Sequence, residues 1–237
     1  MLLTDAFSKY KSEYFLKQFQ VNQGASVVLL DKDHVYFVLT KMNKWKHHED
    51  KIEIKYSGIG GAIENGETPF ECLERELKEE IGLSIKELSF IKPIKVKYIK
   101  PDNKIQEFES KEEDILPLCI FEREFPLRED IIISRRNEYK GSCLQLFIYT
   151  AYSNNRELRI RESEIPALLK IKKKAINDFI QKDQLFDSKQ GSDVIDVIEN
   201  RVFVEKYGSL PSKVLFKAQF TPCALKMVKE DFINILQ

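Results

Sequence analysis

Residues Gly61–Leu83 read GAIENGETPFECLERELKEEIGL and carry closely spaced signals for one helix. Thr68 is the expected N-cap, and Pro69 suits the first helical position, where a missing N–H costs nothing. Glu71 stands three residues after Thr68 and completes a capping box. Gly82 is placed where a helix end favours a left-handed residue. The stretch therefore predicts a helix that begins at Pro69 and ends just before Gly82.

Two kinds of side chain share this expected helix. Glu76, Glu79 and Glu80 are spaced i, i+3, i+4, so they lie on one face. An apolar stripe lies beside them, formed by Phe70, Leu73, Leu77 and Ile81. Adjacent carboxylates repel one another, and a divalent cation turns that repulsion into attraction. Hard oxygen ligands, with substrate phosphates completing the sphere, suit Mg²⁺. We expect the stripe to pack on a sheet and the glutamates to face a cleft.

The spacing of this stretch resembles the Nudix box. Every fixed position of that box is filled, by Gly61, Glu67, Arg75, Glu76, Leu77, Glu79, Glu80, Gly82 and Leu83. A bare Glu-x-x-Glu-Glu on a helix is most often a solvated face, but the full pattern, with its glycines and caps in register, reverses that balance. The resemblance implies an α/β fold, a Nudix-type α/β/α sandwich with mixed sheets. It also implies an enzyme, a pyrophosphohydrolase.

The resemblance further implies roles for the residues of the box. The metal ligands would be Glu76, Glu79 and Glu80, with the carbonyl of Gly60 as a further ligand. The metal would be Mg²⁺, for which Mn²⁺ can substitute, and one glutamate would orient or deprotonate a water. Arg75 would hold carboxylates in place, and Glu67 would either pair with Arg75 or assist at the metal.

Three segments are expected along the chain. Residues 1–21 form an N-terminal helical segment, residues 22–182 the Nudix domain, and residues 183–237 a mainly helical C-terminal extension. Within them we expect helices over residues 4–19, over 162–180 as the closing helix of the sandwich, over Val194–Val204 and over Pro222–Leu236.

The expected strands follow apolar runs. A hairpin is predicted with strands Val27–Leu30 and Val35–Leu39 around a turn at Asp31–Asp33. Further strands are predicted over Ile52–Tyr56, around Ile94–Tyr98, over Leu116–Phe121 and over Cys143–Tyr152. A turn is predicted at Pro101–Asn103, and the acidic segment Glu107–Asp114 is expected to be a loop.

Candidates for substrate binding are few. Lys95 and Lys97 lie on a basic strand face and are candidates for steering a polyphosphate, although an exposed strand face explains them equally. Trp45 is a candidate for stacking on a base, within a polar loop that also holds His47 and His48. An additional acidic residue from a later loop is left open among Glu107, Glu109, Glu112, Glu113, Glu138, Glu162 and Glu164.

Composition narrows the class of partner. Basic and acidic residues balance at 38 each, which argues against nucleic acid as a partner. The four cysteines lack Cys-x-x-Cys spacing and are expected to be reduced thiols of a cytoplasmic protein. No apolar run approaches the ~20 residues that a membrane span needs. The expected partner is a small-molecule nucleotide, and a homodimer built by the extension is an alternative role for that segment.

The substrate is left open by these residues. The expectation is Mg²⁺-dependent hydrolysis of a phosphoanhydride in a nucleoside diphosphate linked to another moiety, of the ADP-ribose or dinucleoside polyphosphate type, with a nucleoside triphosphate also open. The alternative is a nucleotide-sensing, Nudix-like regulator or binding protein. Residues 183–237 show no clear helix-turn-helix with a basic second helix, which weighs against that alternative.

Overall fold

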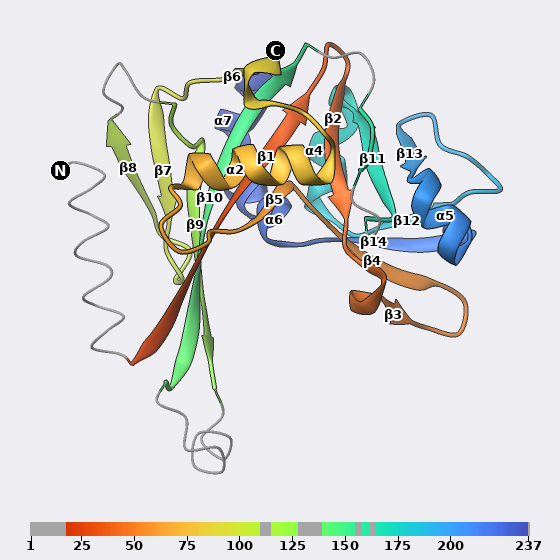
Figure 1. Cartoon of the computed structure of the whole chain (residues 1–237), viewed down its shortest axis with the longest axis horizontal. Coiled ribbons are helices and arrows are strands. Elements are labelled where there is room, and N and C mark those ends of the chain that lie inside the picture. Colours follow the sequence, from red (N-terminus) through yellow and green to blue (C-terminus); the bar gives the residue numbers. More distant parts are fainter. Residues whose placement is uncertain (1–17, 110–114, 128–138, 155–157, 162–164, 237) are drawn as a thin grey trace.

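The computed structural model describes residues 18–109, 115–127, 139–154, 158–161 and 165–236. The strands of these residues join into one 14-stranded network, with helices on both of its faces (Figure 1). The strands are β1 (Phe19–Leu30), β2 (His34–Leu39), β3 (Lys46–His47), β4 (Ile52–Ser57), β5 (Ile59–Ala62), β6 (Leu88–Phe90), β7 (Lys95–Ile99), β8 (Ile105–Glu109), β9 (Cys119–Pro126), β10 (Gly141–Ser153), β11 (Ala167–Lys172), β12 (Gln184–Asp187), β13 (Ile195–Glu199) and β14 (Lys213–Ala218).

Five α-helices and two 3-10 turns complete the described residues. They are α2 (Pro69–Glu80), α4 (Lys173–Gln181), α5 (Arg201–Tyr207), α6 (Phe220–Met227), α7 (Lys229–Leu236), η1 (Met42–Lys44) and η2 (Ile85–Glu87). The main path through the sheet runs β12-β14-β4-β2-β1-β10-β9-β7-β8. The pairs β1–β10, β14–β4 and β7–β9 are parallel and the other pairs are antiparallel, so the sheet is mixed as expected.

Strand β1 separates two hydrophobic cores. Ala25, Val27 and Leu29 belong to the core that also contains the apolar stripe of α2. Val28 and Leu30 point the other way and belong to the core that holds buried residues of α4, α6 and α7. Because successive side chains of a strand alternate between faces, one strand supplies both cores. Figure 1 shows α2 in front of the sheet and α6 and α7 behind it, which confirms the α/β/α sandwich.

The helix α2 begins and ends where the sequence predicts. The backbone N–H of Glu71 donates to Thr68 Oγ1 at 3.2 Å, and the N–H of Thr68 donates to Glu71 Oε2 at 2.7 Å, so the capping box is complete. Gly82 follows the helix with a φ of +69°. Leu73 and Leu77 are fully buried and Ile81 nearly so. Local capping signals and one apolar stripe therefore suffice to specify α2.

The predicted hairpin and several strands are also confirmed. Asp31 Oδ1 accepts the backbone N–H groups of Asp33 and His34, each at 2.7 Å, and this closes the turn between β1 and β2. β4, β7, β9 and β10 overlap the strands predicted for them, and a turn occupies residues 101–103.

The helix predicted over residues 162–180 is wrong in its first part. Residues 162–164 lie outside the described residues, Ala167–Lys172 is the strand β11, and the helix α4 begins only at Lys173. β11 pairs with β2 on one side and with β13 on the other, and its first three residues, Ala167–Leu169, are buried on both faces, whereas Lys170 is half-buried and Lys172 is exposed. The apolar start Ala167–Leu169 shows no strand alternation, and the alternation of Leu169–Lys172 is too short to outweigh the helical pattern that continues into α4.

Two other predictions need similar corrections. The helix predicted over Val194–Val204 is wrong in its first half, because Ile195–Glu199 is β13 and α5 starts at Arg201, after the N-cap Asn200. The loop predicted over Glu107–Asp114 is wrong in its described part, because Ile105–Glu109 is the edge strand β8, paired with β7. In both cases pairing with a distant strand decides the structure, and local sequence does not show it.

Described residues near both ends of the sequence belong to the sheet. Residues 1–17, which hold most of the predicted N-terminal helix, lie outside the described residues, and Phe19 already starts β1. The helices predicted over Pro222–Leu236 are confirmed as α6 and α7. β14 lies parallel to β4, so residues after 182 complete the same sheet. The division of the chain at residue 182 stays a prediction.

The fully buried Phe216 of β14 provides a stability test. We expect Phe216→Ala to lower the free energy of unfolding by about 3–5 kcal/mol, because it empties a packed site in the shared core. Leu185→Ala is the matched control, since Leu185 is 64% exposed, and it should change stability by less than about 0.5 kcal/mol. Urea unfolding of the full chain measures both. A negligible loss for Phe216→Ala would show that β14 does not fold cooperatively with the sheet.

Candidate active site

One cleft of about 710 Å³ opens where β5 leaves the main path of the sheet. Backbone and side chains of β1, β2, β5 and β10 form much of its lining, and three further groups of side chains project into it. The face of α2 provides Glu76, Glu79 and Glu80; the segment after β2 provides Lys41 and Lys44; and the start of α6 provides Gln219, Phe220 and Thr221. The expectation that the three glutamates face a cleft is therefore met.

Glu80 is the most deeply placed carboxylate of the cleft. It is only 7% exposed, and its Oε2 accepts the backbone N–H of Gly60 at 3.1 Å. Gly60 also lines the cleft and pairs with Ser26 of β1 in the sheet. A buried carboxylate needs hydrogen-bond partners to offset its lost hydration, and the β5 backbone supplies one of them.

Gly61 lets the strand approach the helix closely. A Cβ atom built on Gly61 would lie 2.1 Å from Glu76 Oε1, a distance at which the two atoms overlap. A side chain at this position would therefore displace the Glu76 carboxylate, and glycine lets it lie against β5. This explains in physical terms why the stretch begins with glycine.

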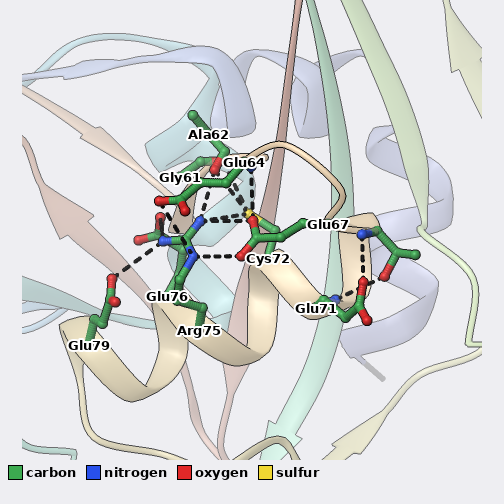
Figure 2. Close-up of polar contacts among 10 residues, drawn as sticks. Gly61, Ala62, Glu64, Glu67, Glu71, Cys72, Arg75, Glu76 and Glu79 are labelled. Carbon is green, nitrogen blue, oxygen red and sulfur yellow. Dashed lines mark hydrogen bonds and ion pairs between the residues drawn. The ribbon is translucent and has the colours of Figure 1, made fainter.

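Arg75 joins the glutamates and the loop that precedes α2 (Figure 2). Its Nε and Nη2 donate to the two oxygens of Glu67 at 2.8 and 3.1 Å. Nη1 donates to Glu76 Oε1 at 2.7 Å and to Glu79 Oε2 at 3.4 Å. Nη2 also donates to the carbonyl of Ala62 at 2.9 Å. A planar guanidinium with five N–H groups can hold all of these acceptors at once, and a lysine cannot.

The ion pair changes the acidity of both groups. The hydrogen bonds from Arg75 hold the pKa of Glu67 below its usual value. Glu67, and then Glu76, raise the pKa of Arg75, against the opposing effect of burial. Glu67 thus takes the first of the two roles predicted for it, the pair with Arg75. Glu71 caps the helix and is not a partner of Arg75.

The predicted substrate-binding residues do not reach the cleft. Lys95 pairs with Glu107 of β8 at 2.8 Å, and Lys97 pairs with Glu107 and with Asp231 of α7. The indole Nε1 of Trp45 donates to the carbonyl of Thr40 at 2.8 Å, and its ring lies 6.1 Å from that of Phe203. All three side chains have structural partners, and none lines the cleft within the described residues.

The later acidic candidates divide into two groups. Glu107 and Glu109 lie on β8, outside the cleft residues, and Lys95 and Lys97 lower the pKa of Glu107 to about 2. The other candidates, Glu112, Glu113, Glu138, Glu162 and Glu164, lie outside the described residues. Within the described residues, no group of three or more His, Cys, Asp and Glu side chains is arranged to hold a metal ion.

The sequence interpretation missed Lys41, Lys44 and the segment Gln219–Thr221 as cleft residues. The two lysines lie within five residues of the end of the predicted strand Val35–Leu39. Their position near the residues of the box could therefore have been predicted from the sequence. The position of Gln219–Thr221 depends on the pairing of β14 with β4, residues about 160 positions apart, for which the sequence carries no local signal.

The family model of the NUDIX domain matches residues 21–139, half of the chain, and the chain therefore belongs to the Nudix family. With every fixed position of the box filled, it is a pyrophosphohydrolase of that family.

No helix in the described parts of the chain has the length and apolar character needed to cross a membrane.

Several solved structures are similar to the chain. A hydrolase of the NUDIX family from Clostridium perfringens is 22% identical, with 66% of this chain and 84% of that one covered and a TM-score of 0.38. A MutT/nudix family protein from Enterococcus faecalis is 12% identical, with 99% and 70% covered and a TM-score of 0.41. The Ap4A hydrolase of C. elegans is 13% identical, with 92% and 100% covered and a TM-score of 0.37. At these identities and TM-scores the likenesses support no inference about substrate.

The Glu67–Arg75 pair should make stability depend on pH. Because the folded pKa of Glu67 is lowered from 4.5, the stabilisation is fully present above that value and is lost as the pH falls through the lowered pKa. The difference in unfolding free energy between wild type and Glu67→Gln should therefore be largest near neutral pH and shrink in acid. Glu74→Gln, on the exposed part of the same helix, is the control. A wild-type advantage over Glu67→Gln that persists unchanged at pH 3 would contradict the assignment.

Proposed function

We propose that the chain hydrolyses a phosphoanhydride bond in a nucleoside diphosphate linked to another moiety, of the ADP-ribose or dinucleoside polyphosphate type, with Mg²⁺ as cofactor. A nucleoside triphosphate is a further option within this class. The observation that carries the proposal is the make-up of one cleft, in which Glu76, Glu79 and Glu80 share a space with Lys41 and Lys44. Carboxylates suit divalent cations and lysines suit phosphates, so the cleft can hold both halves of a metal–polyphosphate complex.

The residue types of the cleft suit a divalent cation, although in the described residues the three carboxylates are not already gathered as a set of metal ligands. Glu80 places a nearly buried carboxylate against β5, and the glycine at position 61 lets the Glu76 carboxylate lie against the same strand. Glu79 is on the same helix face, with 57% of its side chain exposed. We assign the metal to Glu76, Glu79, Glu80 and the carbonyl of Gly60. Mn²⁺ can take the same oxygen ligands.

When bound, the metal supplies neutralisation of phosphate charge and a water of lowered pKa. The other charged side chains of the site would position the ligands and the substrate. Arg75 fixes the Glu76 carboxylate through its 2.7 Å contact and is itself held by both oxygens of Glu67. Lys41 and Lys44 would orient the phosphates for attack. Hydrolysis of a phosphoanhydride depends mainly on such charge stabilisation and alignment, which this set of residues can provide.

We also place the protein in the cytoplasm. All four cysteines are free thiols, and three of them are buried. Thiols that stay unpaired are typical of a reducing compartment. The partner that the proposal requires is a small nucleotide, without nucleic acid or membrane.

The decisive experiment incubates the full chain with Mg²⁺ and a panel that includes ADP-ribose, dinucleoside polyphosphates and nucleoside triphosphates, and identifies the products by mass. We expect Glu80→Gln to lower kcat by more than about 100-fold, since loss of outer-shell partners alone costs 10–100-fold. Glu74→Gln is the matched control and should keep full turnover. EDTA should abolish activity, and Mn²⁺ should restore part of it.

The competing nucleotide-sensing role has a distinct result in the same assay. A chain that cleaves no compound of the panel, while a nucleotide raises its Tm in the presence of Mg²⁺, would contradict the hydrolase proposal and support a binding protein. Unchanged turnover of Glu80→Gln, with cleavage intact, would instead overturn the assignment of the site.

A further inference from the structure

One wall of the cleft, the far wall, is formed by residues 219–221. These residues lie outside the part of the chain that the family model matches, residues 21–139. Gln219, Phe220 and Thr221 at the start of α6 line the same cleft as the glutamates of α2. Phe220 is the one aromatic side chain that lines this cleft among the residues that the structure describes. The fold therefore brings an aromatic ring and the proposed metal ligands to a single space.

This segment is held firmly by the sheet. β14 runs parallel to β4, with Ala218 beside Tyr56, and the N–H of Gln219 donates to the carbonyl of Tyr56 at 3.0 Å. The hydrogen bond extends the ladder by one residue beyond the strand. Phe220 thus follows directly on paired backbone, so its main chain has a fixed position.

A buried cluster of hydroxyl groups locks the next residue. Thr221 is fully buried, and its Oγ1 lies 2.9 Å from Ser26 Oγ and accepts from Ser57 Oγ at 3.2 Å. Gly58 makes the approach possible, because a Cβ there would lie 2.9 Å from the carbonyl oxygen of Val27 and 3.0 Å from Thr221 Cγ2. The start of α6 is therefore fixed to the two strands that border the cleft.

Phe220 itself is placed as a platform. Its ring lies 6.0 Å from that of Phe125 at 75°, an edge arrangement that steadies the ring. The side chain is half-buried, so it packs on the core and still lines the cleft. A half-buried, supported ring beside a metal–phosphate site is the arrangement that stacks on a nucleobase.

We propose that Phe220 stacks on the base of the bound nucleotide and so determines that the substrate is a nucleotide. The inference rests on the proposed function for the position of the phosphates. It assigns to Phe220 the base-stacking role for which the sequence had suggested Trp45, whose ring is packed against Phe203.

The test measures binding of two hydrolysis-inert probes to the full chain by calorimetry in Mg²⁺ buffer. The probes are AMP and ribose 5-phosphate, which carries a hydroxyl group where AMP carries the base. Wild type should bind AMP about tenfold more tightly than ribose 5-phosphate, the effect of one base stacked on an aromatic ring. In Phe220→Leu, which keeps apolar bulk in the core, the ratio should fall to about one, and Phe220→Tyr should restore it.

The ratio separates recognition from structure. A substitution that only loosens the cleft weakens both probes together and leaves their ratio unchanged, so an unchanged ratio in Phe220→Leu would overturn the proposal. A ratio of one in wild type would overturn it as well. Because neither probe is cleaved, a result against Phe220 leaves the hydrolase proposal standing. Base-dependent binding without cleavage of any compound in the panel would support the role of Phe220 and contradict the hydrolase proposal.

Discussion

The ion pairs of Arg75 are the interaction on which the site depends. One guanidinium contacts Glu67 and Ala62, which precede the helix, and Glu76 and Glu79, which lie on it. Its side chain is 23% exposed, so these contacts are partly shielded from water and from salt. Without this cation, three carboxylates would repel one another across a loop and a helix. With it, the loop, the helix and β5 form one unit whose acidic groups have defined positions.

The sheet extends that order beyond the box. β1 supplies one core with Ala25, Val27 and Leu29 and the other with Val28 and Leu30. α2 closes the first core, while α6 and α7 close the second (Figure 1). Along β1 the neighbouring strand changes from β5, which pairs with Gly24–Val27, to β2, which pairs with Leu29 and Leu30, and the cleft lies beside this change. Both layers of helix reach the cleft at this point, which explains how α2 and α6 line it from opposite faces of the sheet.

What the sequence predicts well is local. The capping box of Thr68 and Glu71, the stripe of α2 and the turn at Asp31 are each specified by neighbours within five residues, and each is confirmed. The strand β11 was predicted as helix because its apolar start, Ala167–Leu169, carries no period of two and the helix α4 follows it directly. The far wall of the cleft was missed for a related reason. Thr221 is hydrogen-bonded to Ser26, 195 residues away in the sequence. No pattern within either segment predicts that contact.

The hydroxyl cluster of Thr221, Ser26 and Ser57 has a consequence for the energetics of the whole chain. It joins the C-terminal helices to β1 and β4 beside the cleft. A compound that contacts both walls binds only while this junction is closed, so its binding free energy adds to the free energy of local opening. At a free concentration 100 times Kd this addition is about 2.7 kcal/mol. Occupancy of the cleft by such a compound would therefore make any opening that separates α6 and α7 from β1 and β4 rarer.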